Sequence, residues 1–115
     1  MDIEEIRLFC NNLPAVSEDV KWGNDLCFSV GYKMFAIAGL SNPVSICFKV
    51  SDDEFDELSS FAGFKPAPYL ARYKWILLEN ASQINSRELQ KYIKQSYELI
   101  KSKLPKKTLK EIRLI

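Results

Sequence analysis

Three successive apolar runs between residues 26 and 50 constrain the fold more than any other feature of the sequence. Leu26, Phe28 and Val30 form the first run and alternate with polar or small residues, and residues 33–40 and 44–50 form the next two. Side chains two positions apart share one face of a strand, so an alternating run has one apolar face. The pattern predicts three neighbouring strands.

The connections between these runs are short. Gly31-Tyr32 separates the first two, and Ser41-Asn42-Pro43 separates the last two. Connections of this length join antiparallel strands. We therefore expect an antiparallel meander whose apolar face must be covered by other elements.

Three segments carry helix signals that could provide this cover. The segments 2–12 and 51–58 each open on an Asp or Ser that lies three residues before a Glu, which is a capping-box spacing. Asn85 and Glu88 have a similar spacing and open the longest helix, which we expect to end near Lys103.

The remaining segments complete the predicted order. Residues 14–24 and 61–71 contain Pro and Gly and are predicted to be loops, and residues 74–79 are a further strand. The result is an α+β domain over residues 1–115, with the order α-β-β-β-α-β-α and an antiparallel sheet of about four strands or more. Residues 105–115 form a basic C-terminal extension.

The chain has no histidine. That absence excludes Ser-His and Cys-His nucleophilic pairs and most zinc and iron sites. The glycines are isolated, so no Gly-rich phosphate loop is present. We expect no enzymatic activity, no catalytic residue and no cofactor.

The three cysteines, Cys10, Cys27 and Cys47, are odd in number and widely spaced, which favours reduced thiols. The first residues lack the basic and apolar regions of a secretory signal. No apolar run approaches the roughly 20 residues that cross a bilayer. We expect a cytoplasmic protein without a membrane partner, either a monomer or a weak dimer.

Carboxylates crowd the start of the predicted second helix, at Asp52, Asp53, Glu54, Asp56 and Glu57. Negative charge stabilises a helix N-terminus, and this is the interpretation we favour. The alternative is a site for a hard cation, whose ligands are carboxylate oxygens.

The charge is unevenly distributed along the chain. Residues 1–57 contain eleven acidic and four basic residues, a net charge of −7, whereas residues 58–115 contain four acidic and twelve basic residues, a net charge of +8. Cations gathered on one face could hold phosphates. Among the nearby aromatic residues, we expect Trp75 to pack in the core.

Several spaced strings resemble the MmcQ/YjbR family of small bacterial proteins, over about residues 2–108. The matching strings are Leu13-Pro14, Trp22-Gly23, Leu26-Cys27-Phe28-Ser29-Val30, Lys33-Met34-Phe35-Ala36, Phe48-Lys49, Pro68-Tyr69, Arg72-Tyr73-Lys74-Trp75, Ser96-Tyr97-Glu98-Leu99 and Lys103-Leu104-Pro105-Lys106-Lys107. The resemblance implies a CyaY-like architecture with a double-wing shape, and double-stranded DNA as a partner. Many members have a histidine where this chain has Lys74, so no role of that histidine carries over.

Our first hypothesis is therefore a non-enzymatic DNA-binding protein. The side chains expected to contact phosphates are Lys49, Arg72, Lys74, Lys94, Lys101, Lys106 and Lys107. The alternative is a protein-interaction or small-ligand-binding module that uses the loop 61–69 as an apolar contact surface.

Overall fold

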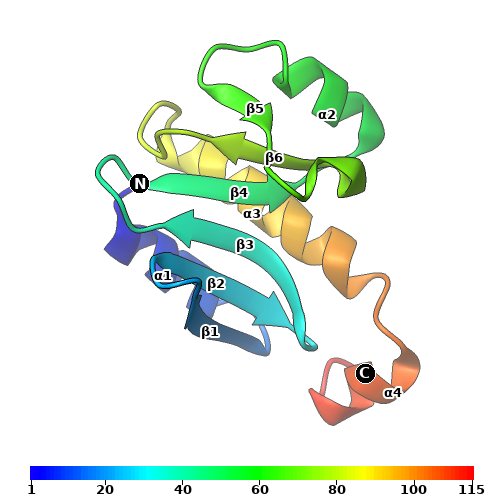
Figure 1. Ribbon diagram of the computed structural model, residues 1–115. Coiled ribbons are helices and arrows are strands. Elements are labelled where there is room, and N and C mark those ends of the chain that lie inside the picture. The colour runs from blue at the N-terminus through cyan, green and yellow to red at the C-terminus, as the bar shows by residue number, and fades with distance from the viewer.

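The computed structural model describes residues 1–115 and contains one sheet of six strands covered by helices (Figure 1). The elements are α1 (Ile3–Asn11), β1 (Val16–Lys21), β2 (Asp25–Val30), β3 (Lys33–Gly39), β4 (Ser45–Lys49), α2 (Asp52–Leu58), β5 (Phe64–Pro66), the short 3-10 helix η1 (Ala71–Tyr73), β6 (Trp75–Leu78), α3 (Ser86–Lys101) and α4 (Lys106–Glu111). The strand order is β1-β2-β3-β4-β6-β5, and every neighbouring pair is antiparallel. The predicted α+β fold and the central meander are confirmed.

Two strands lie where the sequence predicts loops. Residues 14–24 contain β1 and residues 61–71 contain β5, so both loop predictions were wrong. Each of these strands lies at an edge of the sheet, and β1 is mostly exposed. Edge strands are held by backbone hydrogen bonds to one neighbour and need little apolar surface, so their sequences lack the alternation that marks inner strands.

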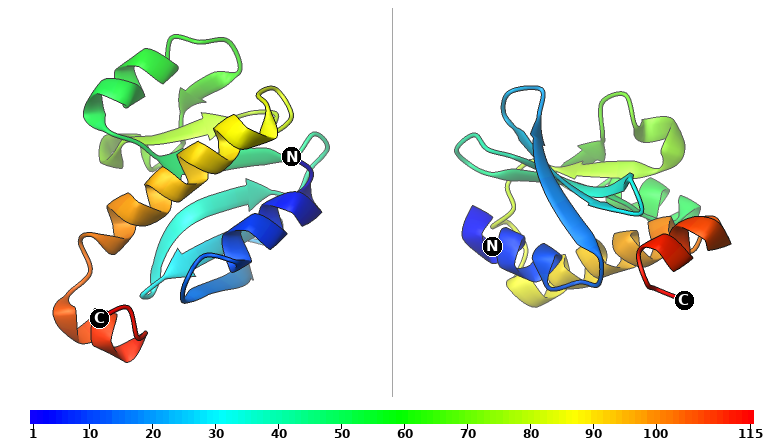
Figure 2. Two further views of the ribbon diagram at one scale, coloured as in Figure 1. Left: turned by 180° about the vertical axis from the view of Figure 1, so that it is seen from behind. Right: turned by 90° about the horizontal axis from the view of Figure 1, so that it is seen from below.

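The α-helices cover only one face of the sheet. Figure 2 shows α1 and α3 side by side on that face, with α3 running obliquely across the strands. The side chains of Phe28, Ile46 and Phe48 meet Leu89 and Ile93 of α3 in the main core, and all five are completely buried. The inner face of α3 is thus an apolar stripe that includes Leu89 and Ile93.

A bulge in β3 is bridged by a buried serine of α3. Phe28 pairs with Ala36 and Ser29 with Met34, so Phe35 is the additional residue. The hydroxyl of Ser96 accepts a hydrogen bond from the backbone N–H of Lys49 at 2.9 Å and donates one to the carbonyl of Phe35 at 2.7 Å. Ser96 therefore satisfies two backbone groups that the sheet ladder leaves free.

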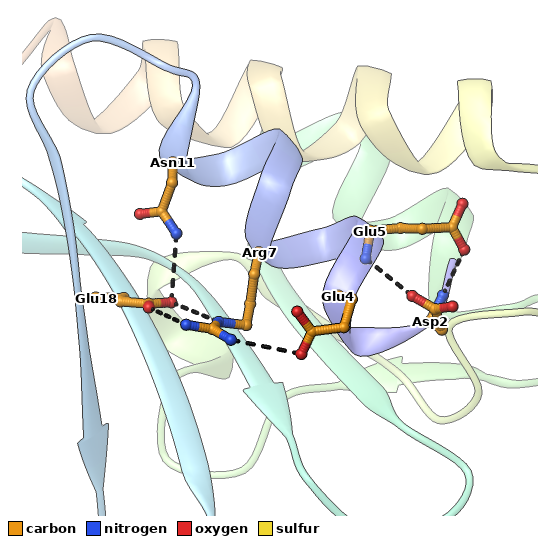
Figure 3. A network of polar contacts seen from close by, with 6 residues as sticks. All are labelled: Asp2, Glu4, Glu5, Arg7, Asn11 and Glu18. Atoms are coloured by element: carbon orange, nitrogen blue, oxygen red, sulfur yellow. Dashed lines mark hydrogen bonds and ion pairs between the residues drawn. The ribbon is translucent and has the colours of Figure 1, made fainter.

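An ion pair attaches α1 to the edge strand β1 (Figure 3). Arg7 donates two hydrogen bonds to the carboxylate of Glu18, at 3.1 and 2.7 Å, and Asn11 contacts the same carboxylate. The predicted capping box of Asp2 and Glu5 is present at the start of α1. These contacts fix the position of an otherwise exposed edge.

The C-terminal residues fold back as α4. Leu104 is buried, and Leu109 and Ile112 pack against the main core. The basic extension predicted for 105–115 therefore includes a docked helix, below the end of the β2–β3 hairpin in Figure 1. No helix is both long and apolar enough to cross a membrane.

Candidate functional site

The face of the sheet without helices carries a second, smaller apolar cluster. The register places Cys27, Ile37, Cys47 and Leu77 in one row across four strands. Trp75 packs at one side of this row and is only 5% exposed, as predicted for a core residue. In Figure 2 (right) the β1–β2 turn and the segment before β6 both rise on this side of the sheet.

A cavity of about 650 Å³ lies on this face, between the row and the segment 67–70. Eight of its twelve lining residues are apolar, including Ile37, Cys47 and Leu77. Two large aromatic side chains, Trp22 and Tyr69, form part of its rim and are 70% and 99% exposed. Cavities of this size are typical of small-molecule sites.

The thiols in the sheet are protonated at neutral pH. Burial, together with the nearby Asp25 carboxylate, raises the pKa of Cys47 to about 12. Burial also raises the pKa of Cys27. All three cysteines are free, and a protonated thiol is a weak nucleophile. The cavity floor therefore carries no charge and no reactive thiolate.

A cluster of cations lies at the end of β4, where β4 meets η1 and β6. The ammonium of Lys49 donates a hydrogen bond to the carbonyl of Tyr73. The guanidinium of Arg72 lies 4.8 Å from the Tyr73 ring centroid, and the ammonium of Lys74 lies 4.9 Å from the Phe55 ring centroid. The backbone N–H of Val50, the residue after β4, donates a 2.9 Å hydrogen bond to the carbonyl of Lys74. This bond holds the end of β4 next to the segment that enters β6.

Lys103, which follows α3, joins this cluster. Partial burial lowers the pKa of Lys49, and the neighbouring charges of Lys103 and Lys74 lower it further, while Asp52 opposes them. None of the four ion pairs in the structure includes Lys49, Arg72, Lys74 or Lys103. We refer to these four residues as the cation cluster.

The other predicted phosphate contacts lie elsewhere. Lys94 is on the exposed side of α3, which covers the opposite face of the sheet from the side chain of Lys49. Lys101 is engaged by Glu98 at 3.3 Å and lies above the Tyr97 ring. Lys106 and Lys107 are exposed at the start of α4, a few residues beyond Lys103. The seven predicted residues thus do not form one compact group.

The alternative sites predicted from the sequence have different outcomes. In α2, Ser51 and Glu54 form the predicted capping box. No group of three or more carboxylates or thiols lies close enough together to hold a metal ion. In the loop 61–69, which was predicted as an apolar contact surface, Phe64 is buried beside Phe61. Tyr69 is exposed and forms part of the cavity rim. Sequence reasoning did not identify Trp22, Asp25 or Lys103 as site residues.

The YjbR family model matches residues 11–99. A crystal structure of a Deinococcus radiodurans protein with a DUF419 domain has a TM-score of 0.84 and 24% identity, with 96% of this chain and 86% of that chain covered. For a crystal structure of a Pseudomonas syringae protein the values are 0.72 and 17%, with 86% and 98% covered. No curated protein sequence matches the chain.

Proposed function

This chain belongs to the YjbR family, and we propose that it is a non-enzymatic, double-stranded DNA-binding protein whose phosphate contacts centre on the cation cluster. The observation that supports this proposal is that Lys74 and Lys103, from separate elements, lie near Lys49, and that Arg72 flanks Tyr73, whose carbonyl accepts a hydrogen bond from Lys49. None of the four is in an ion pair. Like charges repel, so such a cluster is costly alone and favourable beside an anion.

The surroundings of the cluster suggest the direction in which DNA would run. Asp52 at the start of α2 lies close enough to raise the pKa of Lys49. The positive surface therefore ends on the side of α2. Lys106 and Lys107 extend the positive charge from Lys103 along α4. We therefore propose six phosphate contacts, and we leave out Lys94 and Lys101 because of where they lie.

Salt dependence tests the proposal. Fluorescence anisotropy of a labelled duplex, titrated at several salt concentrations, should give a log-log slope of about −5 for six phosphate contacts. No binding at low salt would end the proposal.

Matched variants locate the contacts. Lys103→Ala removes an exposed side chain of the cluster, and the slope should become shallower by about 0.9. Lys21→Ala is the control, since the register aligns Lys21 with Asp25, Gly39 and Ser45 at the other end of the sheet from Lys49. Equal losses in the two variants would show that only net charge matters.

The free thiols fit the reducing cytoplasm that we propose as its location.

A further inference from the structure

The cavity on the face of the sheet opposite the α-helices shares no lining residue with the cation cluster and has a chemistry of its own. Its floor is formed by Ile37, Cys47 and Leu77, which come from three adjacent strands. An apolar floor inside a concavity of about 650 Å³ can remove most of a small molecule's surface from water.

The aromatic rim is held in an uncommon backbone conformation. Trp22 and Tyr69 have φ values of 54° and 66°, in the left-handed region that bulky side chains rarely adopt. Both side chains are mostly exposed, so neither contributes much to the core. Both aromatic side chains are therefore available for contact with another molecule.

One corner of the cavity is polar. Asp25, Gly39 and Ser45 are aligned across β2, β3 and β4, and all three line the cavity. A Cβ added at Gly39 would lie 2.4 Å from Ser45 Oγ and 3.9 Å from Asp25 Oδ1. The glycine therefore leaves a space that is bordered by a hydroxyl and a carboxylate oxygen.

Asp25 is the only charged residue that lines the cavity. It takes part in none of the four ion pairs. On the adjacent strand β1, Lys21 is paired with Asp25 in the register, and Asp19 is paired with Cys27. These three side chains give the corner a net charge of −1, which favours a cation.

We propose that this cavity binds a small organic cation, an amine carried on an aromatic or aliphatic body. The body would lie on Ile37, Cys47 and Leu77 between the two rim aromatics, and the ammonium would donate to Asp25 and Ser45. The face of an exposed indole also attracts a cation, so Trp22 adds to the preference. The protonated thiol of Cys47 makes the site one for binding rather than for covalent chemistry.

A fragment titration followed by ¹⁵N NMR tests the proposal on the full chain. The probes are matched sets of arylalkylamines, the corresponding carboxylic acids and the corresponding neutral alcohols. The amines should shift the Trp22 indole N–H and the Cys47 amide and should bind at least tenfold more tightly than the acids. The amide of Ser96, which is buried in α3 on the opposite face of the sheet, serves as an internal reference.

Two variants separate charge from shape. Asp25→Asn should weaken amine binding about tenfold and leave alcohol binding unchanged, whereas Asp56→Asn, which removes an exposed carboxylate of α2 outside the lining, should have little effect. Tyr69→Ala removes a side chain that is 99% exposed and should weaken both classes without unfolding the protein.

Three results would overturn the proposal: acids that bind as well as amines, fragments that leave the Cys47 amide unmoved, and an Asp25→Asn variant that binds amines normally. Concentration-dependent broadening of the same signals without any fragment would identify a second copy of the chain as the occupant, which also contradicts it. DNA binding is measured separately, so failure here leaves the proposal for the cation cluster intact.

Discussion

Replacement of Ser96 by alanine should destabilise the protein more than any other removal of a single hydroxyl. Ser96 is completely buried and satisfies both the N–H of Lys49 and the carbonyl of Phe35. In Ser96→Ala both backbone groups lose their partner at a site that is closed to water. An unsatisfied buried backbone group costs about 1–1.5 kcal/mol or more.

The expected magnitude follows from these two groups. Together they cost about 2–3 kcal/mol, and the higher helix propensity of alanine returns about 0.5 kcal/mol. We therefore expect the free energy of unfolding to fall by about 2 kcal/mol. With a urea m-value of about 1.5 kcal/mol per M, the midpoint should fall by about 1.3 M.

Equilibrium urea denaturation measures this change, with circular dichroism and fluorescence as independent probes. Ser102→Ala is the matched control, because its hydroxyl donates to the carbonyl of Leu99 at an exposed helix end. That variant should change the unfolding free energy by less than about 0.5 kcal/mol. A Ser96→Ala midpoint equal to that of Ser102→Ala would refute the view that Ser96 bridges the bulge.

Two further predictions concern α1 and α4. The hydrogen bonds from Arg7 lower the pKa of Glu18 below its ordinary value of 4.5, so ionised Glu18 stabilises the fold above that pH and the effect is lost as the pH falls through the lowered value. Glu18→Gln should therefore lower the Tm at pH 7, and this difference should shrink as the pH falls below 4.5, whereas Glu4→Gln, at an exposed and longer contact, should change the Tm little at any of these pH values. Gly31→Ala would place a Cβ 2.6 Å from Leu104 Cδ1 at a φ of +58°, whereas Gly23→Ala, at a φ of +82°, meets nothing within 4 Å. Both variants should lose about 1–2 kcal/mol in urea denaturation through backbone strain, and Gly31→Ala should lose more than Gly23→Ala because its Cβ also meets Leu104 and Thr108. A Gly31→Ala variant no less stable than Gly23→Ala would show that Leu104 and α4 move aside without cost.

The sequence predicts the inner part of this fold well, because those elements are specified by burial. The alternation from Leu26 to Val50 and the stripe from Leu89 to Leu104 each follow the period of a partly buried element. The edge strands β1 and β5 were missed, because each buries few side chains and is held mainly by backbone pairing. Their side chains carry no periodic signal.

The candidate sites were harder to predict, because they depend on which elements become neighbours. β6 lies beside β4 although α2 and β5 separate the two along the chain. That crossing brings Lys74 close to Lys49, and it also places Leu77 beside Cys47. The lysines of residues 103–110 mark a basic C-terminal region in the sequence. No sequence pattern, however, shows that Lys103 lies near Lys49 whereas Lys94 does not.

The two edge strands also determine how this protein can meet other chains. β5 offers only three residues and one is Pro66, which has no N–H to donate. β1 is lined along its length by Glu18, Asp19 and Lys21. Added strands and amyloid-like stacking both need a long, uncharged border, so concentrated samples should resist fibril formation. Any assembly would have to form through the broad faces of the molecule.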